Sequence, residues 1–172
     1  EELNEAGAGY YLDALNPSAE IFAFIRKELT TEDGVYPETD YQVTWRIRFA
    51  TNLPTDCTTN PGTQMFLKAG ATKYKPAVIE EDNRAVLNYE KGQGRVGGPA
   101  ATVMGDIAHD GDCEGLDRDD YVPQVLEKTH STTVTSSQDS TLWLLAGVDT
   151  DVSEPLNIYI IRVEVTVEPM VQ

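Results

Sequence analysis

Basic residues are scarce in this chain of 172 residues, and so are long apolar runs. Thirteen lysines and arginines stand against 29 aspartates and glutamates, which gives a formal net charge of −16 at pH 7. That charge repels phosphate backbones and anionic lipid surfaces, so we expect no nucleic-acid partner. No apolar run approaches the roughly 20 residues that a transmembrane helix needs. We therefore expect no membrane insertion of the chain as given.

Motifs of enzymatic chemistry are also missing. His109 and His130 are the only histidines, and no GxSxG nucleophile elbow accompanies them. The glycine-rich run Lys91–Gly98 lacks the GxxxxGK[ST] pattern of a phosphate-binding loop, and we interpret it as a flexible loop. We assign no catalytic residue and expect the protein not to be an enzyme.

Cysteine is limited to two positions, Cys57 and Cys113, each in a polar, loop-like stretch. Neither has a CxxC partner or the spacing of metal ligands. Their setting favours a disulfide between them, and the alternative is two free thiols. A disulfide implies an oxidising compartment, so we expect an extracellular or cell-envelope location.

The clearest pattern in the chain is the alternation of apolar and polar residues. In Tyr41–Phe49 the odd positions are apolar and the even ones polar, and Tyr159–Val167 repeats this arrangement. Alternation places the two kinds of side chain on opposite faces of a strand, so both segments are predicted to be half-buried strands. Thr141–Gly147 is apolar more uniformly, which is typical of a strand covered on both faces.

Further strands are predicted with weaker patterns. Pro123 should lie at an edge or at a strand start, because proline cannot donate to the ladder. Glu20–Leu29 fits a helix or a strand, and we favour the strand. The weaker candidates are Gln64–Ala71, Arg84–Glu90, Ala101–Gly105, Val122–Glu127 and His130–Ser136.

Turn-forming clusters, among them Asn60–Gly62 and Glu81–Asn83, separate these segments. Many strands divided by turns are typical of an all-β sandwich. We expect a flexible N-terminal lead-in over residues 1–18 and one β-sandwich domain over residues 19–169.

Several short motifs stand at wide spacing: Phe49–Asn52 before Cys57, Phe66–Thr72, Gly105–Ala108 before Cys113, Leu142–Asp149 and Tyr159–Val165. Together, from about residue 20 to 168, the chain resembles an uncharacterised family of secreted or lipid-anchored bacterial β-sandwich proteins. The resemblance implies a bacterial envelope setting and a galactose-binding-like jelly roll of roughly 8–10 strands. It supplies no reaction. The acidic stretch Asp151–Pro155 departs from the more glycine-rich turn usual there.

Carboxylates crowd the segment Asp106–Asp120 around Cys113. Calcium prefers several hard oxygen ligands, and the start of this segment is similar to an EF-hand loop. The similarity ends at the twelfth position, which is Tyr121 in place of a glutamate. A calcium site of another type is one interpretation, and a solvated acidic loop held by Cys113 is the simpler one. The candidate calcium ligands are Asp106, Asp110, Asp112, Glu114 and Asp117.

Tyrosines near strand ends suggest a second kind of site. A pyranose ring offers an apolar face rimmed by hydroxyls, which aromatic rings and amides or carboxylates recognise together. Tyr74, Tyr89 and Tyr121 are the candidate ligand-binding residues. The alternative is that these tyrosines only pack at the rim of the sandwich.

These patterns favour a non-catalytic recognition or structural domain at the cell surface, with a glycan or another surface protein as partner and calcium as the candidate cofactor. One alternative is an extracellular carbohydrate-active enzyme whose carboxylates meet only in three dimensions. Another is a subunit of a surface assembly that captures a neighbour's strand on an unpaired edge.

Overall fold

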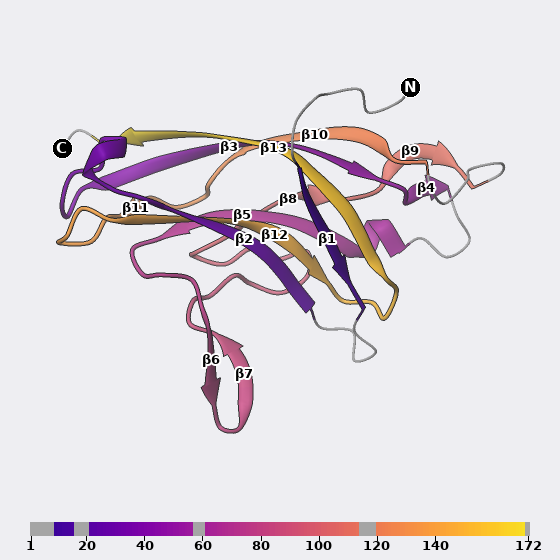
Figure 1. Cartoon of the computed structure of the whole chain (residues 1–172), viewed down its shortest axis with the longest axis horizontal. Coiled ribbons are helices and arrows are strands. Elements are labelled where there is room, and N and C mark those ends of the chain that lie inside the picture. Colours follow the sequence, from indigo (N-terminus) through magenta and orange to yellow (C-terminus); the bar gives the residue numbers. More distant parts are fainter. Residues whose placement is uncertain (1–8, 16–20, 57–60, 114–119, 171–172) are drawn as a thin grey trace.

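The computed structural model describes residues 9–15, 21–56, 61–113 and 120–170, and this part of the chain is all-β (Figure 1). Its helical turns are the short 3₁₀ turns η1 (Thr31–Asp33) and η2 (Pro61–Gln64). Two antiparallel sheets face each other, as the alternating patterns predicted. No helix in these residues is long and apolar enough to span a membrane.

Sheet A forms one layer. Its strand order is β1 (Tyr10–Ala14), β13 (Leu156–Pro169), β3 (Asp40–Thr51) and β10 (Val122–Thr129), and the short β11 (Val134–Thr135) also pairs with β3. Pro123 is the second residue of β10, at the edge of the sheet, where its missing N–H is tolerated as expected.

Sheet B forms the facing layer, in the order β2 (Ile21–Leu29), β12 (Leu142–Thr150), β5 (Met65–Thr72) and β8 (Thr102–Asp106). The ambiguous N-terminal segment is thus a strand, β2. Two smaller pairs complete the described fold. β4 (Pro54–Asp56) runs parallel to β9 (His109–Asp112), and β6 (Val78–Glu81) forms a hairpin with β7 (Arg84–Leu87).

The core lies between the two sheets. Every odd residue of Tyr41–Phe49 is at most 2% exposed, which confirms the predicted alternation. The same core cluster includes Met65 and Leu67 of β5 and Leu144 and Val148 of β12. Residues that point inward at every second position therefore fill the interlayer space.

The predicted alternation of Tyr159–Val167 is wrong in its first part. A β-bulge interrupts the register between Ile160 and Arg162. Before the bulge, Leu156, Ile158 and Ile160 point into the core, and after it Val163, Val165 and Val167 do so. Tyr159 lies on the outer face with 36% exposure. Because the bulge inserts one extra residue, the side chains before it point to the face opposite to the one that regular alternation predicts.

The predicted lead-in over residues 1–18 contains a strand. Tyr10–Ala14 form β1, which pairs with Leu156–Ile160 of β13, so the sandwich begins earlier than residue 19. Residues 1–8 and 16–20 lie outside the described part. The predicted strand His130–Ser136 is also shorter than expected, because only Val134–Thr135 pair.

A long excursion, residues 73–101, connects β5 to β8 and covers the outer face of sheet B (Figure 1). Its hairpin β6–β7 projects from the body and turns at Asp82 and Asn83, both in the left-handed region. Its last part returns against β5 so closely that a Cβ on Gly70 would lie 1.9 Å from the carbonyl oxygen of Ala100. This cover explains why β12 is buried on both faces, as its uniform apolarity predicted.

Candidate functional site

A cleft of about 520 Å³ opens where the excursion meets the ends of β2 and β12. That volume lies within the range of small-molecule sites, about 300–1,000 Å³. The hairpin β6–β7 supplies an apolar side, and the segment after it supplies polar groups. The lining consists of Ile21, Phe22, Val78, Val86, Leu87, Tyr89, Glu90, Lys91, Gly92, Gln93, Asp149, Thr150 and Asp151.

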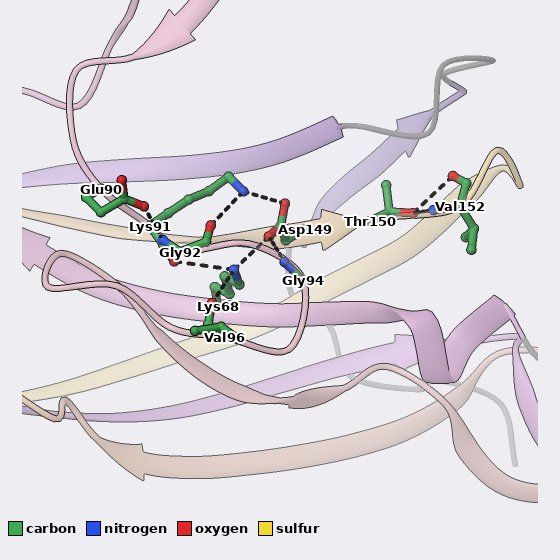
Figure 2. A network of polar contacts seen from close by, with 9 residues as sticks. All are labelled: Lys68, Glu90, Lys91, Gly92, Gly94, Val96, Asp149, Thr150 and Val152. Carbon is green, nitrogen blue, oxygen red and sulfur yellow. Dashed lines mark hydrogen bonds and ion pairs between the residues drawn. The ribbon is translucent and has the colours of Figure 1, made fainter.

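An ion pair joins Lys68 to Asp149, which lines the cleft (Figure 2). Both side chains project from the outer face of sheet B, Lys68 from β5 and Asp149 from β12. Lys68 Nζ lies 2.7 Å from Asp149 Oδ2, and the side chains are 0% and 5% exposed. Charges so deeply buried persist only when they are paired and hydrogen-bonded.

The same two residues also bind the excursion. Lys68 Nζ donates to the carbonyl oxygens of Lys91 and Val96, and Gly94 N donates to Asp149 Oδ2. Lys91 Nζ lies 2.7 Å from Asp149 Oδ1. The run Lys91–Gly98, predicted to be a flexible loop, is thus joined to sheet B by a charged network (Figure 2).

The charges of this network are unequally accessible. Burial lowers the pKa of Lys68, and the hydrogen bond that its ammonium donates to Asp149 opposes that shift. Lys68 is sealed from solvent, so it holds the loop and cannot touch a ligand in the cleft. Lys91 is 18% exposed and is the cation that a ligand can reach. Asp151, Glu90 and Gln93 add exposed oxygens and an amide at the rim.

Aromatic rings line the other side. Phe22 stacks on Phe24 with centroids 5.3 Å apart, and Tyr89 meets Phe24 edge-on at 6.1 Å. Lys91 Nζ lies 5.4 Å from the centroid of Phe22. The Tyr89 hydroxyl is buried and has no hydrogen-bond partner within the described residues. Burial is also the main cause that raises the pKa of Tyr89.

The three tyrosines predicted as ligand contacts do not come together. Tyr89 lines the cleft, whereas Tyr74 is 64% exposed and contacts Lys73 outside the cleft lining. Tyr121 packs edge-on against Tyr159, whose ring stacks on Tyr11 over sheet A. Of the three, only Tyr89 lines this cleft, and the ligand contacts of Tyr74 and Tyr121 stay predictions.

The predicted calcium ligands lie partly outside the described residues. Glu114 and Asp117 lie outside the described residues. Asp106 Oδ1 accepts a hydrogen bond from the backbone N–H of Ala108, and Asp110 is exposed on β9. Within the described ranges, no three or more His, Cys, Asp or Glu side chains form a group that could hold a metal ion.

The predicted disulfide has one partner, Cys57, outside the described residues. The register of the described strands bears on this prediction. Asp56 of β4 is in register with Asp112 of β9, and the next residues are Cys57 and Cys113. Each cysteine therefore directly follows, in the sequence, one member of the paired residues Asp56 and Asp112.

Sequence reasoning did not predict that Lys68, Asp149 and Lys91 pair with one another. Two signals pointed to them. Lys68 is the one charged residue within the strand Met65–Thr72, whose other residues are apolar, small or hydroxylic, and Asp149 ends the apolar run of β12. A charge in a buried strand requires a partner, but the sequence does not show which residue supplies it.

No family model matches this chain, and no curated protein or solved structure does so either. The functional interpretation of the cleft consequently rests on its own chemistry, and the resemblance to secreted bacterial proteins stays a prediction.

Proposed function

We propose that this chain is a non-catalytic recognition domain that binds glycans in the cleft beside the β6–β7 hairpin. The observation that carries the proposal is the combination of Phe22 and Tyr89 with Lys91, Asp151 and Gln93 around one cleft of about 520 Å³. Aromatic and apolar groups suit the apolar face of a sugar ring, and charged and amide groups suit its hydroxyls.

The Tyr89 hydroxyl supports a ligand with hydroxyl groups. A buried polar atom without a partner costs about 1–3 kcal/mol, and this atom belongs to a residue that lines the cleft. Because the hydroxyl is covered in the free protein, a sugar hydroxyl would supply the missing hydrogen bond once a neighbouring side chain moved aside. The net charge of −16 disfavours nucleic acids and other polyanions in the same cleft.

The strand order supports a jelly roll as the finer fold. One sheet has the order β1-β13-β3-β10 and the other β2-β12-β5-β8. Strands that follow one another in the chain thus largely alternate between the layers, and first and last strands pair. Two interlocked Greek keys produce this arrangement.

An extracellular or cell-envelope location accompanies the proposed function, together with a disulfide between Cys57 and Cys113. The register of β4 and β9 favours the disulfide, because it brings Asp56 opposite Asp112 immediately before the two cysteines. Calcium bound by the acidic segment around Cys113 remains part of the proposal, as an aid to folding or binding.

A glycan array tests the proposal, read with and without a calcium chelator. We expect saturable binding of at least one saccharide, which is recovered intact. Release of shortened oligosaccharide would instead indicate the carbohydrate-active enzyme. If saccharide binding is lost only in the presence of the chelator, the protein needs bound calcium in order to bind the saccharide.

Point variants locate the binding in the cleft. Tyr89→Phe keeps the ring and removes a hydroxyl that has no hydrogen-bond partner among the described residues, so its thermal midpoint should not fall. Its glycan affinity should fall about fivefold, the worth of one hydrogen bond. Tyr74→Phe is the matched control and should leave affinity unchanged. Equal affinities in all three proteins, together with unaltered binding by Asp151→Ala, would exclude this cleft.

A further inference from the structure

A second cavity, of about 420 Å³, lies between the two sheets on the side of β2 and β13. It is separate from the glycan cleft, which lies on the outer face of sheet B. Its floor is mostly aliphatic. The lining consists of Tyr10, Ile25, Arg26, Lys27, Trp45, Leu144, Leu145, Ala146, Ile160, Ile161, Arg162, Val163 and Val165.

The strand pairing explains why the sandwich is open here. β1 covers β13 only along Leu156–Ile160. Beyond the bulge, Arg162–Pro169 pair with β3 on one side, and no other described strand pairs with them. On the facing sheet, β2 is an edge strand. Two unpaired edges thus flank an apolar interior.

One buried polar atom of a lining residue has no partner among the described residues. Trp45 is 1% exposed, and its indole Nε1–H donates to no acceptor within the described residues. The indole nitrogen can only donate. This N–H is itself covered, so a ligand acceptor would reach it only after a neighbouring side chain moved, and the indole serves here as a reporter of the cavity.

The mouth of the cavity is cationic although the chain is acidic. Lys27 is in register with Leu144, so its side chain leaves the strand on the inner face, and it is exposed. No ion pair or hydrogen bond joins the Lys27 ammonium to any described residue. Arg26 and Arg162 flank it, the first bonded to the carbonyl oxygen of Pro76 and the second paired with Glu164. Lys27 is therefore the cation that remains for an incoming anion.

We propose that this cavity binds a long-chain carboxylate, with its alkyl chain between the sheets and its head at Lys27. An alkyl chain matches the aliphatic lining, and the volume is within the range of small-molecule sites. A carboxylate is the anion that suits the Lys27 ammonium at the mouth. The inference is independent of glycan binding, since the two sites share no lining residue.

Dodecanoate, kept below its micellar concentration, is the probe that tests the site. In ¹⁵N spectra of the Trp143→Phe variant the only indole N–H belongs to Trp45, because the chain has two tryptophans. We expect saturable titration of this resonance. Titration calorimetry on the unaltered chain should give one site per chain, with dodecanol binding more weakly than dodecanoate.

Charge variants decide whether Lys27 holds the head group. Lys27→Met should weaken dodecanoate binding about fivefold, as expected for a partly exposed ion pair, and leave dodecanol binding unchanged. Lys73→Met, an exposed lysine outside the lining, is the control and should bind as the unaltered chain does. No saturable binding, or equal affinity of the Lys27→Met variant, overturns the proposal. Concentration-dependent dimerisation without dodecanoate binding also overturns it and assigns the cavity to a strand of a second copy.

Discussion

Lys68 Nζ and Asp149 Oδ2 lie 2.7 Å apart on neighbouring strands, on the outer face of a sheet that the chain's own excursion has sealed from water. This ion pair also connects the loop of residues 91–96 to sheet B. It contacts the backbone of residues 91, 94 and 96, so the loop and the sheet are held through the same two charges.

Removing the buried cation should destabilise the protein. Lys68→Met leaves the carbonyl oxygens of Lys91 and Val96 without their donor and removes one of the two cations on Asp149. We expect the free energy of unfolding to fall by about 3 kcal/mol, the lower end for a broken buried pair, because Lys91 remains. Chemical denaturation measures the change.

Arg46→Met provides the control for that measurement. Arg46 pairs with Glu127 and Glu164 on the exposed face of sheet A, where its side chain is 55% exposed. Surface ion pairs contribute about 0–1 kcal/mol. If the free energy of unfolding falls no further in Lys68→Met than in Arg46→Met, the buried ion pair does not stabilise the contact between the loop and sheet B.

Acid should weaken the fold through His130. The ring is buried, its Nε2 lies 3.0 Å from the carbonyl oxygen of Pro99, and its Nδ1 lies 2.7 Å from Thr102 Oγ1. Burial lowers the pKa of His130 below its usual 6.5, although the bond to Pro99 opposes the shift. Between the folded-state pKa and 6.5 the unfolded chain binds more protons, so stability rises with pH there.

The expected result is a free energy of unfolding that decreases as pH falls below about 6.5, by at most about 1.4 kcal/mol per pH unit. It should level off once the folded ring also protonates. Denaturation between pH 7.5 and 5 measures the slope, and titration of the ring by NMR assigns it. A slope that persists unchanged in His130→Gln would assign it to other groups.

The bulge in β13 allows us to predict the effect of deleting single residues from this strand. Ile161 is the extra residue between two inward-facing sets, so its deletion restores regular alternation and keeps Ile160 and Val163 inward. We expect the deletion variant to fold with a small loss of stability. Deletion of Glu164 instead turns Val165 and Val167 outward, at about 3 kcal/mol for two partly buried valines. Thermal unfolding compares the two, and equal losses would contradict this register.

The proposed disulfide makes a stability prediction as well. It would close the chain between residues 57 and 113, and loss of such a link costs about 4 kcal/mol in the chain-entropy model. Cys57→Ser, Cys113→Ser and the double variant should therefore be equally destabilised. Non-reducing peptide mapping should recover the linked pair. An unaltered midpoint in dithiothreitol would mean that the two thiols are free.

Much of the sandwich could be predicted from the local alternation of apolar and polar residues. The alternation fails as a guide where the strand geometry is irregular. The alternation in Tyr41–Phe49 predicts a half-buried strand because every residue keeps its face. The alternation in Tyr159–Val167 misleads, since Ile161 is itself apolar and the bulge that exchanges the faces leaves no mark in composition.

The candidate site was less predictable, because its contacts join distant segments. Tyr89 was expected to contact a ligand and does line the cleft. Lys68, Lys91 and Asp149 come from three separate parts of the chain, and only the register of β5 against β12 and the returning excursion bring them together. Tyr10–Ala14 escaped detection as a strand because Tyr10 and Tyr11 are both exposed, without the alternation that identifies buried strands.

The excursion between β5 and β8 also determines how the protein tolerates a broken backbone. Asp82 and Asn83 lie at the tip of the projecting hairpin, far along the chain from the strands that carry the core. A protease that cuts there would leave two fragments whose strands, β5 and β8, are neighbours in one sheet. The fragments should stay associated, so the tip is a suitable place for an inserted tag or fluorophore that reports on the cleft without entering the sandwich.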